Sequence, residues 1–260
     1  MLTLVGPRIM RPPERETQIV LSSGERLWLP GKFASYRNYQ LGLYERAVFA
    51  LLPSIATNGM TVLDVGASVG LYTLTFSRLV GAAGTVFAFE ADGEAFSYLR
   101  RNIAANARTN VITANVAVTD RVGSVSFVKD GVERGFVAAT HDRTRTATDV
   151  AGITLDEYFA ARKWPAVDLI KMDIEGGEWA ALRGMRELSE RNPNLTLVME
   201  CNTHAIRRSG LTKTQLSSEL HHLGFRQGWV IERSLQALPP NVGLPKDSAL
   251  YNLLLVKAPG

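Results

Sequence analysis

An acid and two glycines stand close together where one apolar run gives way to another, in the stretch TVLDVGASVGLYTLTF. Asp64 comes two residues before Gly66, and Gly70 follows four residues later. Glycine adopts backbone conformations that other residues avoid, and the first amides of a helix offer hydrogen-bond donors and a partial positive charge. The spacing predicts a strand, a glycine turn and a helix start beside a carboxylate. We expect this corner to bind a ligand.

A second acid, Glu90, ends the apolar run TVFAFE about 26 residues after Asp64. In sheets built from alternating strands and helices, an acid at the end of the second strand accepts the hydroxyl hydrogens of a ribose. The ligand is therefore expected to contain a nucleoside.

Two nucleoside cofactors compete for this corner. A nicotinamide dinucleotide needs a middle glycine for its pyrophosphate, whereas the loop reads Gly66, Ala67, Ser68, Val69 and Gly70. An aspartate just before this loop would also face the phosphates. S-adenosylmethionine has no phosphate and carries an ammonium and a sulfonium, so a nearby carboxylate favours it. The sequence therefore predicts S-adenosylmethionine as cofactor.

A group of acids follows the run VDLIKMDI, in KMDIEGGE. Asp173, Glu175 and Glu178 repel one another at a strand end, so they need cations such as the donor's ammonium, Lys171 or a divalent metal. Asp173 and Glu175 are predicted to be functional, and Asp173 also to contact the cofactor. Glu178 is expected to favour the start of the following helix through its dipole.

Methyl transfer to an alcohol needs a base for the hydroxyl proton and alignment of the reacting atoms. His204, in ECNTH, has a suitable unperturbed pKa, and Glu200 lies at the same strand end. A metal is the alternative way to acidify the acceptor, because Asp173, Glu200 and Asn202 would form an oxygen-rich set suited to Mg²⁺. The sequence leaves the metal open.

The elements that position these residues alternate between strands and helices. This pattern predicts a doubly wound α/β fold with a mainly parallel sheet covered on both faces. A helix over 42–57 and a hairpin GSVSFVKD with GFVAAT are also expected, and two close C-terminal strands predict an antiparallel pair. The predicted strands are 61–65, 85–90, 110–118, 167–174, 195–201, 225–232 and 250–257, and the other helices are 69–80, 93–106, 155–162, 177–190 and 212–223.

Four segments, in this order, resemble the FkbM family of S-adenosylmethionine-dependent methyltransferases. They are VLDVGASVGLYT, VFAFEADGEAFSYLRRNIAAN, ITLDEYF and DLIKMDIEGGEWAALRGM, within residues 42–257. The resemblance implies a class I methyltransferase fold, Rossmann-like and usually seven-stranded with the last pair reversed, and commonly O-methylation of sugars or secondary metabolites. Members often carry asparagine in place of Ser68 and proline in place of Ala91, positions that mainly offer backbone and small polar groups.

On this view the cofactor is held along the first three strand ends. Gly66, Ala67 and Ser68 would surround its methionine part, and Gly70 would start the helix. Asp64 would lie near the ammonium or order the loop, Glu90 would hold the ribose, and Ala91, Asn115 and Ala117 would lie near the adenine. Acceptor contacts are expected from residues 202–210 and 235–248.

Composition restricts the remaining classes. With 260 residues, of which 46% are hydrophobic, the chain is expected to form a methyltransferase domain over 42–260 and an N-terminal cap or edge hairpin over 1–41. No apolar run is expected to span a membrane or to act as a secretory signal, and one cysteine excludes an intramolecular disulfide. The net charge is +4, but the basic residues are scattered along the sequence, so we expect no nucleic-acid-binding surface. We expect a cytoplasmic monomer or homodimer acting on a small molecule or glycan. A nicotinamide-dependent oxidoreductase and a cofactor-binding, non-catalytic homologue are the alternatives.

Overall fold

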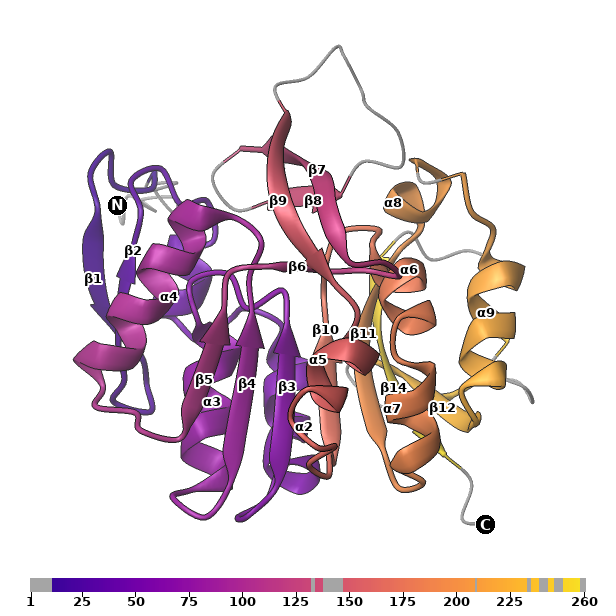
Figure 1. The fold of residues 1–260 in the computed structure, drawn as a ribbon. Coiled ribbons are helices and arrows are strands. Elements are labelled where there is room, and N and C mark those ends of the chain that lie inside the picture. Colours follow the sequence, from indigo (N-terminus) through magenta and orange to yellow (C-terminus); the bar gives the residue numbers. More distant parts are fainter. Residues whose placement is uncertain are drawn as a thin grey trace, which may run out of the picture.

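The computed structural model describes residues 11–131, 134–137, 147–208, 210–232, 235–238, 243–245 and 250–257. Within them the chain is α/β, with an eight-stranded sheet in the order β13-β12-β14-β11-β10-β3-β4-β5 (Figure 1). The bounds are β3 (Thr61–Val65), β4 (Thr85–Phe89), β5 (Val111–Ala114), β10 (Leu169–Met172), β11 (Thr196–Asn202), β12 (Phe225–Ile231), β13 (Leu235–Ala237) and β14 (Leu250–Lys257).

The sheet is mixed. Strands β5, β4, β3, β10 and β11 run parallel, and β14 is antiparallel to both of its neighbours, β11 and β12. The predicted antiparallel pair of C-terminal strands is therefore confirmed. The sheet has eight strands where seven were predicted, because β13 pairs with residues 229–231 of β12. Residues 235–237, at the start of the segment expected to contact the acceptor, thus extend the sheet. The predicted strand 110–118 divides into β5 and β6 (Ala117–Val118).

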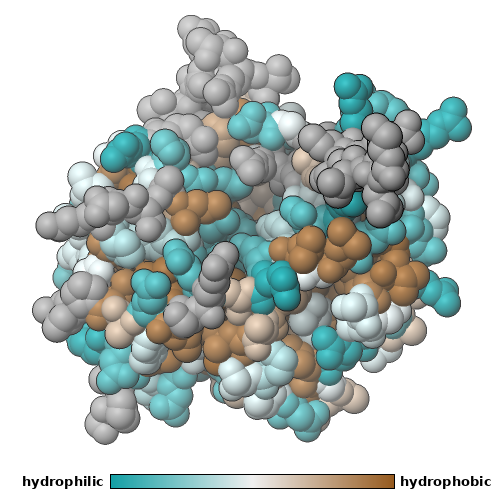
Figure 2. All heavy atoms as spheres, turned by 180° about the vertical axis from the view of Figure 1, so that it is seen from behind, coloured by the Kyte–Doolittle hydropathy of each residue, from teal (hydrophilic) through white to brown (hydrophobic). Residues whose placement is uncertain are grey.

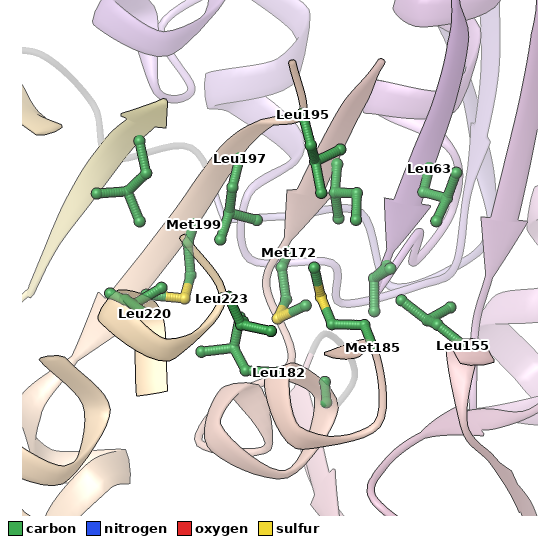
Figure 3. Close-up of a cluster of buried hydrophobic side chains, with 14 of the residues drawn as sticks. Leu63, Leu155, Met172, Leu182, Met185, Leu195, Leu197, Met199, Leu220 and Leu223 are labelled. Carbon is green, nitrogen blue, oxygen red and sulfur yellow. The ribbon is translucent and has the colours of Figure 1, made fainter. Parts of the chain in front are cut away.

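Helices cover both faces of this sheet. One face packs against α5 (Leu155–Ala160), α6 (Glu178–Arg183), α7 (Arg186–Arg191) and α9 (Lys213–His222), in the core shown in Figure 3. The other face packs against α2 (Arg46–Ile55), α3 (Leu71–Val80) and α4 (Gly93–Ala105). Hydrophobic side chains from every second strand residue point to each layer, as expected for a sheet buried on both sides.

Two predicted helices have different bounds in the structure. The helix expected over 177–190 is divided at Gly184, where a Cβ would lie 2.1 Å from the Thr119 carbonyl oxygen. The helix expected over 42–57 begins only at Arg46. Its N-cap, Glu45, is left-handed with φ 41°, and a separate short helix, α1 (Tyr36–Gln40), precedes it. Close backbone packing and a special backbone conformation therefore decide these boundaries.

The predicted N-terminal hairpin is present as β1 (Thr17–Val20) and β2 (Arg26–Leu29). Asn102 of α4 joins it to the domain: its Oδ1 accepts from the Trp28 amide at 2.7 Å, and its Nδ2 donates to the carbonyls of Trp28 and Val69 at 3.0 and 2.8 Å. The hairpin also shares one hydrophobic cluster with α3. A boundary between residues 41 and 42 stays a prediction.

A second sheet, in the order β6-β9-β7-β8, lies above the edge to which the arrows of β3, β4 and β5 point (Figure 1). Its strands include β7 (Gly123–Asp130), β8 (Arg134–Val137) and β9 (Ala147–Ile153). The β7–β8 pairing confirms the predicted hairpin over its described part. Residues 138–140 of GFVAAT lie outside the described residues.

In the described ranges, no helix has both the length and the apolar character needed to cross a bilayer. On the face opposite that of Figure 1, hydrophobic patches alternate with hydrophilic ones (Figure 2).

Candidate active site

A cavity of ≈ 370 Å³ opens at the carboxyl ends of the central parallel strands. The turn after β3, the residues after β4 and the ends of β10 and β11 form its floor. Residues within 33–45 form a second wall, and Phe127 and residues 135–137 of the second sheet form a third. Ligands of open α/β sheets bind at this edge, where the strands end.

The glycine turn has the shape that its sequence predicts. Gly66 has φ 85°, and a Cβ at this position would lie 1.9 Å from the carbonyl oxygen of Asp173. Gly70 has φ 97°, and a Cβ there would lie 2.8 Å from Leu99 Cδ1. Gly66, Ala67 and Ser68 line the cavity, whereas Gly70 does not and instead lets the loop pack on α4.

Asp64 lies beneath this turn and not on the cavity wall. Its side chain is fully buried, and its Oδ2 accepts a hydrogen bond from Thr73 Oγ1 at 2.5 Å. Burial raises the pKa of Asp64, against the opposing effects of Lys171 on the neighbouring strand and of the Thr73 hydroxyl. Asp64 thus contacts α3, the helix that follows the turn, and both of its predicted roles stay predictions.

Glu90 lines the cavity and accepts hydrogen bonds from the Ser68 and Asp92 amides, each at 2.7 Å. Burial raises its pKa to about 7. Ala91 and Ala117 also line the cavity. Asn115 does not: its Nδ2 donates to the carbonyl oxygens of Glu90 and Ala91 at 2.8 and 3.2 Å. Asn115 therefore shapes the turn after β4 from behind.

Three carboxylates meet on the cavity wall, as predicted for two neighbouring strand ends. Oxygens of Asp173, Glu175 and Glu200 all lie within 4.8 Å of one another. Burial, together with the charges of Asp173, Glu45 and Glu175, raises the pKa of Glu200 to about 9. The site therefore favours positive charge, and its carboxyl group Glu200 keeps its proton near neutral pH and becomes a carboxylate as the pH approaches 9.

Glu178 does not line the cavity, and its side chain instead bonds to the backbone of the turn that carries Glu175. Its carboxylate accepts from the backbone amides of Ile174 and Gly176 at 3.1 and 2.9 Å, and burial raises its pKa to about 7. These bonds hold a turn in which Glu175 and Gly176 both have positive φ, at 53° and 106°.

His204 is exposed on α8 (Thr203–Arg208) and does not line the cavity. Its amide and that of Ala205 donate to Asn202 Oδ1 at 3.1 and 3.2 Å, so Asn202 starts a helix that the sequence did not predict. The Asn202 amide group also donates to Glu175 Oε2 at 3.3 Å.

Two segments were predicted to contact the acceptor, residues 202–210 and 235–248. None of their described residues lines the cavity.

The N-terminal wall was missed as part of the site. Tyr39, Tyr44 and Glu45 all line the cavity. Glu45 accepts hydrogen bonds from the Tyr72 hydroxyl and, at 2.9 Å, from Asn252 Nδ2. The only sequence signal is the aromatic and acidic content of YRNYQLGLYE, which carries no spacing that specifies a ligand.

The chain is similar to known methyltransferases. The chain is 27% identical over 195 residues to "Hexuronic acid methyltransferase AglP" of Haloferax volcanii, covering 73% of this chain and 77% of that protein. The structure is similar to P. horikoshii TYW2 in complex with MeSAdo, with a TM-score of 0.50, 15% identity, and coverage of 94% of this chain and 70% of that chain. This likeness shows the fold.

A crystal structure of "Methyltransferase FkbM" from Methylobacillus flagellatus KT also matches, with a TM-score of 0.49 and 18% identity. That match covers 76% of this chain but 44% of the other, so this chain spans less than half of that longer protein. The model of the Methyltransferase FkbM domain matches residues 64–226, which is more than half of the sequence and includes the glycine turn and the acidic cluster. The chain therefore belongs to the FkbM methyltransferase family.

Proposed function

We propose that this protein moves the methyl group of S-adenosylmethionine to a hydroxyl group of a small molecule or glycan. The observation that carries the hydroxyl assignment is Glu200, a carboxyl group on the cavity wall whose pKa is raised to about 9. An alcohol hardly ionises near neutral pH, and a raised pKa makes the carboxylate form of Glu200, which increases as the pH rises towards 9, a stronger base for the hydroxyl proton. The name of the relative AglP supports a sugar as acceptor.

The cavity suits the donor in size and chemistry. Its ≈ 370 Å³ falls within the roughly 300 to 1,000 Å³ of ligand pockets. Gly66, Ala67 and Ser68 would hold the methionine part of the donor. A side chain on Gly66 would clash with the carbonyl oxygen of Asp173 and so distort the turn. Glu90 would accept from the ribose hydroxyls, and Ala91 and Ala117 would border the adenine. When bound, S-adenosylmethionine supplies an activated methyl group on a positively charged sulfur.

The chain's own groups would then prepare the acceptor. In its deprotonated form, Glu200 takes the hydroxyl proton, while Asp173 and Glu175 hold the acceptor's other polar groups and offset the donor's positive charge. We prefer Glu200 to His204 as base because His204 is exposed outside the cavity wall. Oxygens of Asp173, Glu175 and Glu200 also lie close enough together to hold Mg²⁺, and EDTA distinguishes this case.

The first test is thermal unfolding of the whole chain with saturating S-adenosylhomocysteine and, separately, NAD, each with and without EDTA. At about 100 times its dissociation constant a ligand stabilises the fold by roughly 2.7 kcal/mol, which raises the midpoint by several degrees. A shift with S-adenosylhomocysteine supports the donor site, and its loss in EDTA supports a metal. A shift with NAD alone would overturn the proposal in favour of an oxidoreductase.

A second measurement separates an enzyme from a non-catalytic binding protein. Release of S-adenosylhomocysteine from S-adenosylmethionine is followed with hydroxyl acceptors at pH 7 to 9. Donor binding without any transfer would identify the chain as a cofactor-binding homologue that lacks catalysis.

A further inference from the structure

Phe127 of the second sheet lies beside the part of the cavity proposed to hold adenosine. It lines the cavity together with Ala91, and both residues also border a second hollow. Ala91 directly follows Glu90, the residue proposed to hold the ribose. Phe127 is 6% exposed, so its ring is packed although it borders two hollows. An aromatic ring at this place can offer a flat apolar face to a nucleobase.

The neighbouring strand leaves room for this ring. In the pairing of β7 with β8, Phe127 lies opposite Val137, and Gly135 lies diagonally across from it. A Cβ on Gly135 would lie 2.1 Å from Phe127 Cζ, so the ring covers the backbone of the glycine. Aromatic side chains stabilise glycines of edge strands in this way. The glycine therefore fixes where the ring lies on the cavity wall.

Lys129, two residues further along β7, joins the second sheet to the start of α4. Residues two apart on a strand point to the same face. The Nζ of Lys129 lies 2.9 Å from Asp92 Oδ2 and 2.7 Å from Glu94 Oε2. Burial would lower the pKa of Lys129, but its hydrogen bonds to Glu94 and Asp92 outweigh burial and raise the pKa. The ammonium is therefore charged at neutral pH and bridges two carboxylates.

Asp92 connects this bridge to the acid proposed to hold the ribose. Its Oδ1 accepts from the amide of Glu94 at 2.8 Å and caps α4, and its own amide donates to Glu90 Oε1 at 2.7 Å. Lys129 contacts the other carboxylate oxygen of Asp92. A short series of contacts thus links β7 to the carboxylate of Glu90.

We propose, building on the methyl transfer proposed above, that Phe127 forms the wall beside the donor's adenine and that Lys129 is a positioning residue that holds this wall in place. The side chain of Lys129 is 35% exposed, so its ion pairs have a moderate effect that salt screens. Donor affinity, and not the transfer step, is expected to depend on them.

The test compares Lys129→Met, Lys129→Arg and Lys163→Met in the whole chain. Lys163→Met is the matched control, because it removes a lysine charge at an exposed position outside the cavity. Calorimetry measures the Kd of S-adenosylhomocysteine and of methylthioadenosine, which lacks the amino acid part of the donor. We expect Lys129→Met to raise both Kd values by the same factor, roughly three- to tenfold, and Lys129→Arg to restore most of the affinity. Lys163→Met should leave both values unchanged.

Salt dependence and kinetics separate positioning by charge from a general loss of structure. The difference in Kd between wild type and Lys129→Met should shrink in about 1 M NaCl, where the Debye length is about 3 Å. The KM for S-adenosylmethionine should rise in Lys129→Met, while kcat at saturating donor stays within about twofold of wild type. Equal Kd values in wild type and Lys129→Met would overturn the role of Lys129. A raised KM for the acceptor with unchanged donor affinity would place this wall beside the acceptor and would also overturn the inference.

Phe127→Leu tests the ring itself, because it keeps an apolar side chain in the second sheet and removes the flat face. We expect the Kd of methylthioadenosine to rise by roughly three- to tenfold. Unchanged affinity would overturn the role of Phe127, although the proposed function would stand. If the wild-type chain bound neither ligand, the donor site itself would be contradicted, and the proposed function would fail together with this inference.

Discussion

Gly66 lies directly against the backbone of Asp173: a Cβ on the glycine would be 1.9 Å from the aspartate's carbonyl oxygen. The amide of Asp173 also donates to the carbonyl of Val65 at 3.0 Å. The turn predicted to hold the donor and the strand end that carries the acidic cluster are thus in contact. A change at either one is expected to disturb both.

Gly66→Ala is expected to lower the free energy of unfolding by about 3 kcal/mol or more and to abolish S-adenosylhomocysteine binding, because it combines a left-handed backbone with a steric clash. Gly24→Ala is the matched control, since Gly24 has φ 93° and no atom within 4 Å of its Cβ position. Chemical denaturation and calorimetry measure the two effects. Equal losses at both glycines would show that the contact with Asp173 has no energetic importance.

Glu200→Gln is expected to reduce kcat by roughly 10² to 10⁴ while leaving S-adenosylhomocysteine affinity nearly unchanged. Because the pKa of Glu200 is raised to about 9, its basic form increases as the pH rises. Wild-type kcat/KM should therefore increase from pH 7 towards 9, and this increase should disappear in the variant. A variant that keeps the wild-type rate and pH profile would place the base elsewhere.

Glu178→Gln tests the carboxyl group behind the cluster through the pH dependence of stability. Burial raises its pKa from an ordinary 4.5 to about 7, so between these values the folded state holds a proton that the unfolded state has lost. The contribution of Glu178 to stability is fully present below pH 4.5 and declines up to pH 7. The stability difference between wild type and variant should fall by about 1 to 3 kcal/mol over this window. Urea unfolding at several pH values measures it, and a constant difference would contradict the shift.

Lys171→Met is expected to destabilise the fold by about 3 to 5 kcal/mol, because it leaves buried carboxylates without their cation. Adding Asp64→Asn removes one of these charges and should recover part of the loss. A double-mutant cycle in urea measures the coupling between the two side chains. Strictly additive effects would show that Lys171 does not balance Asp64.

The part of the fold in which strands and helices alternate regularly could be predicted from the sequence. The runs ending at Asp64 and Glu90 are apolar throughout, as in strands covered on both faces, and glycines or acids mark where each strand ends. Parallel strands bring such ends to one edge, so the meeting of the glycine turn with Asp173 and Glu200 followed from the order of elements alone.

Contacts between distant segments could not be predicted in this way. Gly184 ends a helix because it packs against Thr119, which is far away in the sequence. Glu45 reaches the cavity because Tyr72 and Asn252 hold its carboxylate, and neither residue is near it in sequence. The role of His204 was suggested by its residue type, whereas its place on an exposed helix face follows from the cap at Asn202.

The position of β14 has a consequence for synthesis of the chain. This strand lies between β11 and β12 and pairs with both, although it follows them in sequence. On the ribosome, β11 and β12 are made before the strand that joins them, so the order of translation differs from the order of the sheet. Nascent chains that stall before residue 250 would expose an unpaired edge of β11, which makes them targets for chaperones and for aggregation.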